Sequence, residues 1–274
     1  MKKFAIIGNP IGHSLSPTLH NYWFNKYKIV AKYDLLEIQE NQIKKTIDDI
    51  RNGKLKGVNV TTPYKQKVIP FIDKLSSSAI ESYSVNTITL DHEKNIVGDN
   101  TDIYGLLSGY LKQIFEKPNN LKALIIGAGG VAPSVYVALK QSFITDISLI
   151  NRTYEKSIFL KKKFSDLKIL QWSEIQKIVK NFDIIINATS LGLKNSEDFN
   201  FLFEDFKSSL IYIDTIYNPI ETKMIKHLKA KGVKTFNGLD MFIYQGQKSF
   251  YLWNKINPEI NDDLVNLLVS RIND

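Results

Sequence analysis

The sequence predicts an α/β protein of two domains, the first built around a mostly parallel sheet. Two observations support this fold class. Short apolar runs alternate with amphipathic stretches along the chain, which is typical of parallel strands joined by helices. In the second half, the glycine-rich segment GAGGVA at 127–132 follows one apolar run and opens a helical stretch. The chain of 274 residues is long enough for two such domains.

The first hundred residues contain apolar runs typical of buried strands, separated by stretches typical of surface helices. Strands are expected at 2–8, 32–38, 55–63 and 84–90. Helices are expected at 16–27 and 41–50. Ser16 is the expected N-cap of the first helix, and Pro17 its first residue. This order of elements predicts a sheet covered by helices on both faces.

A second unit is expected from about residue 101, where a helix at 101–115 leads to a strand at 123–126 and then to the glycine turn. Further strands, with helices between them, are expected at 145–153, 181–190 and 209–217. After residue 238 the chain is expected to be helical. We therefore expect one domain formed by 1–101 and 239–274, to which the last helices return, and another formed by 102–238.

The composition excludes several kinds of chemistry. Because the chain has no cysteine, disulfides, thiol catalysis and cysteine-ligated metals are ruled out, and a reducing, cytoplasmic location fits. No stretch is long enough to span a membrane, and the apolar run near the N-terminus is too short for a signal segment. His13 and His20 have no carboxylate cluster beside them in the sequence, so no metal site is expected.

The net charge of +8 raises the alternative of a nucleic-acid binder. The lysines are scattered, however, and the chain has only three arginines: Arg51, Arg152 and Arg271. Arginine is the preferred reader of bases and phosphates. We therefore expect solvated lysine faces that attract anionic metabolites, and no nucleic-acid partner.

The GAGGVA segment fits the glycine pattern of dinucleotide-binding turns, with Ala132 in the third place. Gly127 would make the tight turn, and Gly129 would let a pyrophosphate approach the backbone at the start of the following helix. An ordinary turn at the start of a helix is the alternative interpretation. The preceding strand and the following helix favour a Rossmann-like, dinucleotide-binding domain.

The end of the next strand indicates which dinucleotide is bound. A site specific for NAD carries an acid about 20 residues after the first glycine. Here Asn151 takes that place, Arg152 follows it, and Lys156 lies one helical turn further on. An amide, a guanidinium and an ammonium suit a 2′-phosphate, so these residues predict NADP. The alternative is that Arg152 is an ordinary surface residue.

The first half contains a set of polar side chains just after predicted strands or at helix starts. They are Ser14, Ser16, Asn59, Thr61, Lys65, Asn86 and Asp102. Each has an ordinary alternative role, such as a cap, a turn residue or a solvated lysine. In a parallel sheet, however, the carboxyl ends of the strands line one crevice, so these groups should lie close together.

Together these stretches resemble the shikimate dehydrogenase family over nearly the whole chain. The matching motifs, in the family's order, are GNPIGHSLSPTLHN, NVTTPYK, VNT, GDNTD, GAGG, NRT, NATSLG, YNP and GLDMFIYQGQKSFYLW. The resemblance implies reversible reduction of 3-dehydroshikimate to shikimate with NADPH, a step in the biosynthesis of chorismate and the aromatic amino acids. It also implies that 102–238 binds NADP and that the other domain binds the substrate.

The resemblance assigns roles to residues of both domains. The substrate carboxylate would be held by Ser14, Ser16 and Tyr217. The ring hydroxyls and the carbonyl side would be held by Asn59, Thr61, Lys65, Asn86, Asp102 and Gln245. The cofactor would be held by Gly127, Ala128, Gly129, Gly130, Val131, Ala132, Asn151, Arg152, Thr153, Lys156, Thr189, Gly238 and Met241. The chain departs from the family's usual residues at Tyr83, Ser84, Ile103 and Leu193. The resemblance therefore does not determine the detailed shape of the substrate pocket.

Lys65 and Asp102 match the family's catalytic pair. The Lys65 ammonium would donate a proton to the reduced carbonyl oxygen or stabilise its charge, and Asp102 would position that ammonium. One alternative is a dehydrogenase that also accepts quinate. Another is a cofactor-sensing binding protein without turnover, which would need neither Lys65 nor Asp102. The expected partners are small molecules, and the protein is expected to be a monomer or a homodimer.

Overall fold

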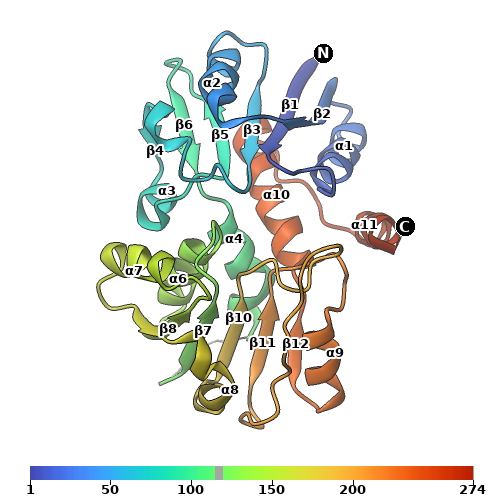
Figure 1. Cartoon of the computed structure of the whole chain (residues 1–274). Helices are drawn as coiled ribbons and strands as arrows, with labels where there is room; N and C mark the ends of the chain where they lie inside the picture. Colours follow the sequence, from blue (N-terminus) through green and yellow to red (C-terminus); the bar gives the residue numbers. More distant parts are fainter. Residues whose placement is uncertain (115–119, 274) are drawn as a thin grey trace. The chain divides into compact units, whose positions relative to one another are not determined.

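The computed structural model describes residues 1–114 and 120–273, which form two compact units (Figure 1). The first unit comprises Met1–Gly105 and Ile243–Ile272, and the second comprises Leu106–Phe242. The division falls a few residues later than the sequence suggested at both places. Phe115, placed in a helix from the sequence, and Asp274, placed in the first domain, lie outside the described residues.

A six-stranded sheet forms the centre of the first unit, with the strand order β2-β1-β3-β5-β6-β4. Its strands are β1 (Lys2–Gly8), β2 (Ala31–Glu37), β3 (Gly57–Val60), β4 (Lys74–Leu75), β5 (Thr87–Leu90) and β6 (Ile96–Asp99). The pairs β1–β2, β1–β3 and β4–β6 are parallel, whereas β5 runs antiparallel to both of its neighbours. The mixed α/β fold class is confirmed, and β4 and β6 are additions to the strands expected from the sequence.

Helices cover both faces of this sheet, because alternate side chains of each strand point to opposite sides. The helices of this unit are α1 (Ser16–Lys26), α2 (Ile43–Arg51), α3 (Ser77–Ser82), α10 (Leu239–Asn254) and α11 (Asp262–Asn273), and α1, α2 and α10 pack against the sheet. Phe4 of β1 contacts Phe24 of α1 and Trp253 of α10, with ring centroids 5.2 and 5.0 Å away. Ile7 of β1 belongs instead to the apolar cluster that includes Ile47 of α2.

The close packing of α10 depends on a glycine in β3. A Cβ on Gly57 would lie 2.2 Å from the indole nitrogen of Trp253. The Trp253 indole donates a hydrogen bond to the Ile88 carbonyl oxygen at 3.1 Å, on the neighbouring strand. This contact fixes the register of α10 against the sheet, and therefore the positions of the polar residues on the same helix.

The second unit has an entirely parallel sheet with the strand order β12-β11-β10-β7-β8-β9. Its strands are β7 (Lys122–Ile126), β8 (Asp146–Ile150), β9 (Lys168–Leu170), β10 (Ile184–Asn187), β11 (Ile211–Asp214) and β12 (Lys234–Phe236). The chain starts at β7, builds to one edge and then returns to build the other. This is the doubly wound order, and its crevice lies at the carboxyl ends of β7 and β10.

The helices of the second unit connect these strands. They are α6 (Ala132–Gln141), α7 (Tyr154–Lys163), α8 (Ile175–Ile178) and α9 (Lys223–Ala230). A continuous helical segment also runs from α4 (Asp102–Leu106) through a π-helical turn to α5 (Lys112–Ile114). The short strands β9 and β12 were not expected from the sequence. The expected strand at 209–217 is shorter in the structure, because only Ile211–Asp214 joins the ladder.

One prediction about helix capping was wrong. Leu15 occupies the N-cap position of α1, and Ser16 is the first residue of the helix. The Ser16 backbone N–H donates to the Ser14 hydroxyl oxygen at 3.3 Å, so Ser14 satisfies a donor at the start of α1. Because Pro17 has no backbone N–H, it costs no hydrogen bond in this first turn.

Candidate active site

The first unit contains a lysine–aspartate pair, with Lys65 in the loop after β3 and Asp102 shortly after the end of β6. The Lys65 ammonium donates to a carboxylate oxygen of Asp102 at 2.6 Å. The side chains are 12% and 6% exposed, so water screens the pair much less than it would screen a surface ion pair. The Lys65 carbonyl oxygen accepts from the Val85 N–H at 2.8 Å, which ties the loop after β3 to the segment before β5.

Asp102 keeps both carboxylate oxygens available because another residue caps its helix. The Asn100 side-chain oxygen accepts from the backbone N–H groups of Asp102 and Ile103, at 3.0 and 3.3 Å. One Asp102 oxygen therefore pairs with Lys65, while the other accepts from the Asn86 amide at 2.9 Å. Asp102 is thus not the cap of α4, which was its ordinary alternative role.

The antiparallel direction of β5 explains how Asn86 reaches this site. The sequence suggested a strand from 84, but β5 begins at Thr87, so Asn86 immediately precedes it. Because β5 opposes β3, its amino end lies beside the carboxyl end of β3. The end of β6 lies there too, since Thr87 pairs with Asp99. Three loops thereby bring Lys65, Asn86 and Asp102 together.

Asn59 lies next to Asn86 in the protein interior and is only 3% exposed. Its amide nitrogen has three acceptors at 3.0–3.1 Å: the Asn86 carbonyl and the hydroxyls of Thr87 and Ser249. Its amide oxygen accepts from the Tyr33 hydroxyl at 2.7 Å. The Asn59 amide is therefore engaged within the protein, and its contact with the substrate, implied by the resemblance, stays a prediction.

A buried hydroxyl cluster joins Asn59 to Asn86. Thr87, Thr101 and Ser249 lie within hydrogen-bonding distance of one another, at 2.8–3.3 Å. The Thr101 N–H also donates to the Asn86 side-chain oxygen at 2.7 Å, which sets the direction of that amide. Sequence reasoning did not single out these three hydroxyl groups. All three lie within motifs quoted above, VNT, GDNTD and GLDMFIYQGQKSFYLW, but nothing in those motifs marks the three hydroxyls as neighbours.

The remaining predicted substrate residues occupy several places. Ser14 donates to the Ser16 hydroxyl at 3.2 Å, and Ser16 is buried. Thr61 follows β3 and is half-buried, and Gln245 lies one helical turn before Ser249, whose hydroxyl donates to the Gln245 carbonyl at 3.0 Å. Tyr217 belongs to the second unit, where its ring centroid lies 4.6 Å from that of Phe242.

The glycine turn of the second unit has the features expected of an anion-binding turn. Gly127 has a φ of +109°, and a Cβ there would lie 2.6 Å from the Thr189 methyl carbon. Gly129 is different, because a Cβ added there would have only the Ala188 oxygen within 4 Å, at 3.9 Å. Gly127 is thus required by the protein itself, whereas Gly129 leaves its surface open to a ligand.

Asn151 holds this turn in place from the next strand. Its side-chain oxygen accepts from the Ala128 N–H at 3.1 Å, and its amide donates to the Thr153 carbonyl at 2.7 Å. Both ends of the amide are therefore engaged within the protein. Arg152 and Lys156 are exposed and remain the cations of this segment that could meet a phosphate.

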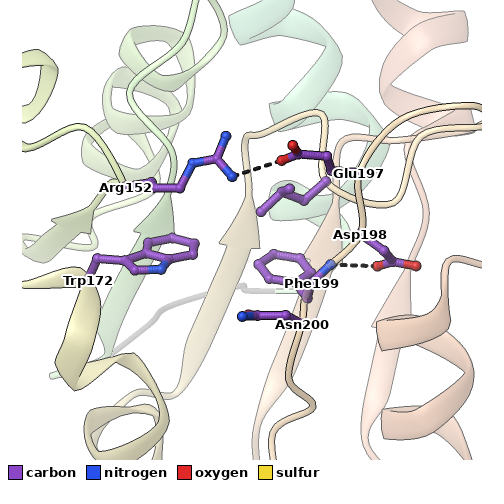
Figure 2. A pocket seen from close by; sticks show the side chains of 7 residues that line it. Arg152, Trp172, Glu197, Asp198, Phe199 and Asn200 are labelled. Atoms are coloured by element: carbon purple, nitrogen blue, oxygen red, sulfur yellow. Dashed lines mark hydrogen bonds and ion pairs between the residues drawn. The ribbon is translucent and has the colours of Figure 1, made fainter.

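A pocket of about 380 Å³ lies beside Arg152 in the second unit (Figure 2). It is lined by Arg152, Trp172, Leu191, Glu197, Asp198, Phe199 and Asn200. Trp172 follows β9 and presents its indole to the pocket, opposite Phe199 (Figure 2). Sequence reasoning missed Trp172 and Glu197, since the first follows an unexpected strand and the second lies in an irregular loop.

A buried carboxylate organises the loop after β10. Asp214 accepts from the Asn187 amide, the Ile216 N–H and the Thr222 hydroxyl, each at 3.0–3.1 Å. Burial raises the pKa of Asp214 to about 7, against the opposing effect of these donors. The Asn187 oxygen in turn accepts from the Thr189 hydroxyl at 2.7 Å, so this network fixes the start of the loop.

Gly238 lies between β12 and α10, and Met241 lies in the first turn of α10. A Cβ on Gly238 would lie 2.2 Å from the Thr215 carbonyl oxygen, so only glycine fits this approach. The Met241 N–H donates to the Tyr110 hydroxyl at 3.1 Å. Among residues 1–114 and 120–273, no group of three or more metal-ligating side chains is found. In the same part of the chain, no helix is long and apolar enough to cross a membrane.

These features define a class of protein. A parallel, doubly wound unit with a glycine turn, joined to an α/β unit carrying a buried ammonium–carboxylate pair, is the arrangement of a two-domain dehydrogenase that uses a nicotinamide dinucleotide. Two family models match the chain. The shikimate dehydrogenase substrate binding domain matches residues 6–88, and shikimate / quinate 5-dehydrogenase matches residues 110–224. The chain belongs to the shikimate dehydrogenase family.

Individual relatives agree with this assignment. A protein of Pelagibacter ubique named shikimate dehydrogenase (NADP(+)) is 47% identical over 267 residues, covering 97% of this chain and 98% of the relative. The crystal structure of shikimate dehydrogenase from Aquifex aeolicus has a TM-score of 0.87 at 32% identity, covering 100% of this chain and 98% of the other. Shikimate 5-dehydrogenase from Thermus thermophilus, in complex with NADP(H) and shikimate, has a TM-score of 0.84 at 27% identity, covering 100% and 99%.

Proposed function

We propose that this chain is an NADP-dependent shikimate dehydrogenase, which reduces 3-dehydroshikimate reversibly to shikimate. The observation that carries the proposal is the Lys65–Asp102 pair, 2.6 Å apart and nearly buried, on a chain whose relatives carry this name. Reduction of a carbonyl needs a proton donor beside the oxygen that gains negative charge. The Lys65 ammonium supplies such a proton from within the protein.

The residues of the second unit fit NADP. The open surface of Gly129, at the start of α6, suits a pyrophosphate, because backbone N–H groups at a helix start favour an anion. Arg152 and Lys156 suit a 2′-phosphate, and Asn151 holds the turn rather than the phosphate. Thr189, Gly238 and Met241 are proposed for the nicotinamide half. When bound, the cofactor supplies the hydride.

The first unit supplies the proton and the orientation. Lys65 donates a proton to the substrate's carbonyl oxygen as that oxygen becomes an alkoxide. Asp102 holds the ammonium in place, and its second oxygen is fixed by Asn86. Asn59 is proposed to have a supporting role beside its predicted contact with the substrate. It positions Asn86 through the buried hydroxyl cluster, so the ammonium and the carboxylate keep one arrangement.

Hydroxyl and amide groups are proposed to hold the rest of the substrate. Ser14 and Ser16, together with Tyr217, would bind the carboxylate. Thr61, Asn86 and Gln245 would bind the ring hydroxyls. The proposed partners are therefore the small-molecule substrate and the nucleotide. The oligomeric state, monomer or homodimer, and the cytoplasmic location stay predictions.

Dual specificity for shikimate and quinate is the second candidate, since one matching family model is described as shikimate / quinate 5-dehydrogenase. Quinate carries an additional hydroxyl at C1, beside the carboxylate. The serine hydroxyls proposed for that corner already bond to each other, at 3.2 Å. An added hydroxyl without a partner costs about 1–3 kcal/mol, which corresponds to about 5- to 150-fold discrimination. Shikimate should therefore be the preferred substrate.

The test is an assay of four combinations, in which shikimate or quinate is oxidised with NADP or NAD and the absorbance of the reduced cofactor is followed. The proposal expects the highest kcat/KM for shikimate with NADP. A quinate value within about threefold of the shikimate value would favour the second candidate instead. Binding of both ligands without turnover would identify a cofactor-sensing protein.

A further inference from the structure

The nucleotide end of the second unit contains an ion pair that the proposed function does not use. An Arg152 guanidinium nitrogen lies 2.8 Å from a carboxylate oxygen of Glu197, and both side chains line the pocket in Figure 2. Arg152 follows β8, whereas Glu197 lies in the loop after β10. The residue proposed to bind a 2′-phosphate is therefore already paired with an anion of the same chain.

The position of Glu197 is set by the backbone of its loop. The Gly192 N–H donates to the Glu197 carbonyl oxygen at 2.8 Å, which closes the loop between them. Gly192 has a φ of +98°, a conformation that side chains other than glycine rarely adopt. The Lys194 N–H also donates to the Asn218 carbonyl at 2.9 Å. The closed and anchored loop thus places the Glu197 carboxylate beside the Arg152 guanidinium.

We propose that Glu197 is a specificity-determining residue that competes with the 2′-phosphate of the cofactor for Arg152. This inference rests on the proposed NADP-dependent function. A carboxylate and a phosphate both accept hydrogen bonds from the guanidinium and both carry negative charge, so each weakens the binding of the other. Glu197 therefore lowers the affinity for nucleotides with a 2′-phosphate and has no such effect on nucleotides without one.

The expected effect is small, because both side chains are largely exposed, at 67% and 71%. Exposed ion pairs contribute about 0.2–1 kcal/mol, which corresponds to about 1.4- to 5-fold in a binding constant. Replacing Glu197 with glutamine keeps the size of the side chain and removes its charge. Glu197→Gln should therefore tighten the binding of 2′-phosphorylated nucleotides by about two- to fivefold.

The test measures the binding of adenosine 2′,5′-bisphosphate and of 5′-AMP by calorimetry to the full chain. In Glu197→Gln, the bisphosphate should bind about two- to fivefold more tightly, and 5′-AMP should change by less than about 1.5-fold. The gain should disappear in the Arg152→Gln background, because the competitor then has no partner. It should also shrink at about 0.5 M salt, where exposed charges are screened.

Glu155→Gln provides the matched control. Glu155 is also an exposed carboxylate, three residues from Arg152, and its loss changes the net charge equally. An equal gain in this control, an equal gain for 5′-AMP, or no gain in Glu197→Gln would overturn the inference. If the wild-type chain binds the bisphosphate no more tightly than 5′-AMP, the proposed preference for NADP fails, and the inference fails with it.

Discussion

Asn100 caps α4 through its side-chain oxygen, and this leaves the Asp102 carboxylate free to pair with Lys65. The cap bond to the Asp102 N–H is 3.0 Å long, and the ion pair is 2.6 Å long. An aspartate at the start of a helix would normally have its oxygens drawn to the first backbone N–H groups. Here the Asn100 side-chain oxygen accepts from these N–H groups instead, so the Asp102 carboxylate can orient the Lys65 ammonium.

Removing the charge of Asp102 should therefore affect the reaction directly. In Asp102→Asn, the Lys65 ammonium loses a charged hydrogen-bond partner, an interaction worth about 1.5–3 kcal/mol. We expect kcat for shikimate oxidation to fall by about 10- to 150-fold. Asp34→Asn, on the surface strand β2, is the control and should keep the wild-type rate. Equal kcat values for the wild type, Asp102→Asn and Asp34→Asn would show that Asp102 does not position Lys65.

Arg152 should discriminate between the two cofactors. In Arg152→Ala, NADP loses its guanidinium contact, whereas NAD has no phosphate there to lose. We expect NADP binding to weaken by about tenfold, the lower end of the range for a charged hydrogen bond, because Arg152 is exposed and already pairs with Glu197. Dissociation constants for both nucleotides provide the measurement. Equal losses for NADP and NAD would mean that Arg152 has a structural role.

Asn59 should matter for stability, because its amide is buried and fully engaged. In Asn59→Ala, the Tyr33 hydroxyl and the hydroxyls of Thr87 and Ser249 lose a partner. Buried groups left unpaired cost about 1–3 kcal/mol, and the free energy of unfolding should fall by this amount. Urea denaturation gives the value, with Asn25→Ala on the exposed face of α1 as the control. A variant as stable as the wild type would place Asn59 in a less constrained environment than the structure shows.

His20 should make the stability depend on pH. Its ring is buried and stacked on Tyr33, with the centroids 4.5 Å apart, and neither ring nitrogen has a hydrogen-bond partner among the described residues. Burial lowers the pKa of His20 from 6.5 to about 3, although the nearby Asn59 side chain acts in the opposite direction. Between these values the unfolded chain binds a proton that the folded chain does not, so stability falls as the pH falls.

The corresponding test compares the wild type with His20→Phe between pH 4 and 6.5. The histidine contributes a loss of up to about 1.4 kcal/mol in unfolding free energy for each pH unit below 6.5. A phenylalanine keeps the aromatic packing and cannot bind a proton, so its slope against pH should be shallower by that amount. Identical slopes would mean that His20 is protonated in the folded protein.

Long apolar runs made much of the fold predictable from the sequence. Strand β1 was expected at its observed bounds, and the glycine turn was placed between a strand and a helix as observed. The strands β4, β9 and β12 have two or three residues, which is too short for a recognisable period. The direction of β5 also could not be read, since a half-buried strand has the same pattern in either direction.

The site was harder to predict than the fold. Asn59 and Asn86 have the same residue type and similar places in their motifs. Asn59, however, bonds to the buried hydroxyl cluster, whereas Asn86 donates to the Asp102 carboxylate. Only the sheet pairing separates these roles. Ser249 lies 190 residues from Asn59 in the sequence and reaches it through the register of α10, which no local pattern reveals.

The central claim is that Lys65 transfers the proton, and the most direct test is the steady-state kinetics of Lys65→Ala with shikimate and NADP. The loss of an acid–base group lowers rates by about 10²–10⁴-fold. We predict a fall of that size in kcat and a much smaller change in both KM values, because other residues hold the substrate and the nucleotide. A variant that keeps more than about half of the wild-type kcat would contradict the assignment.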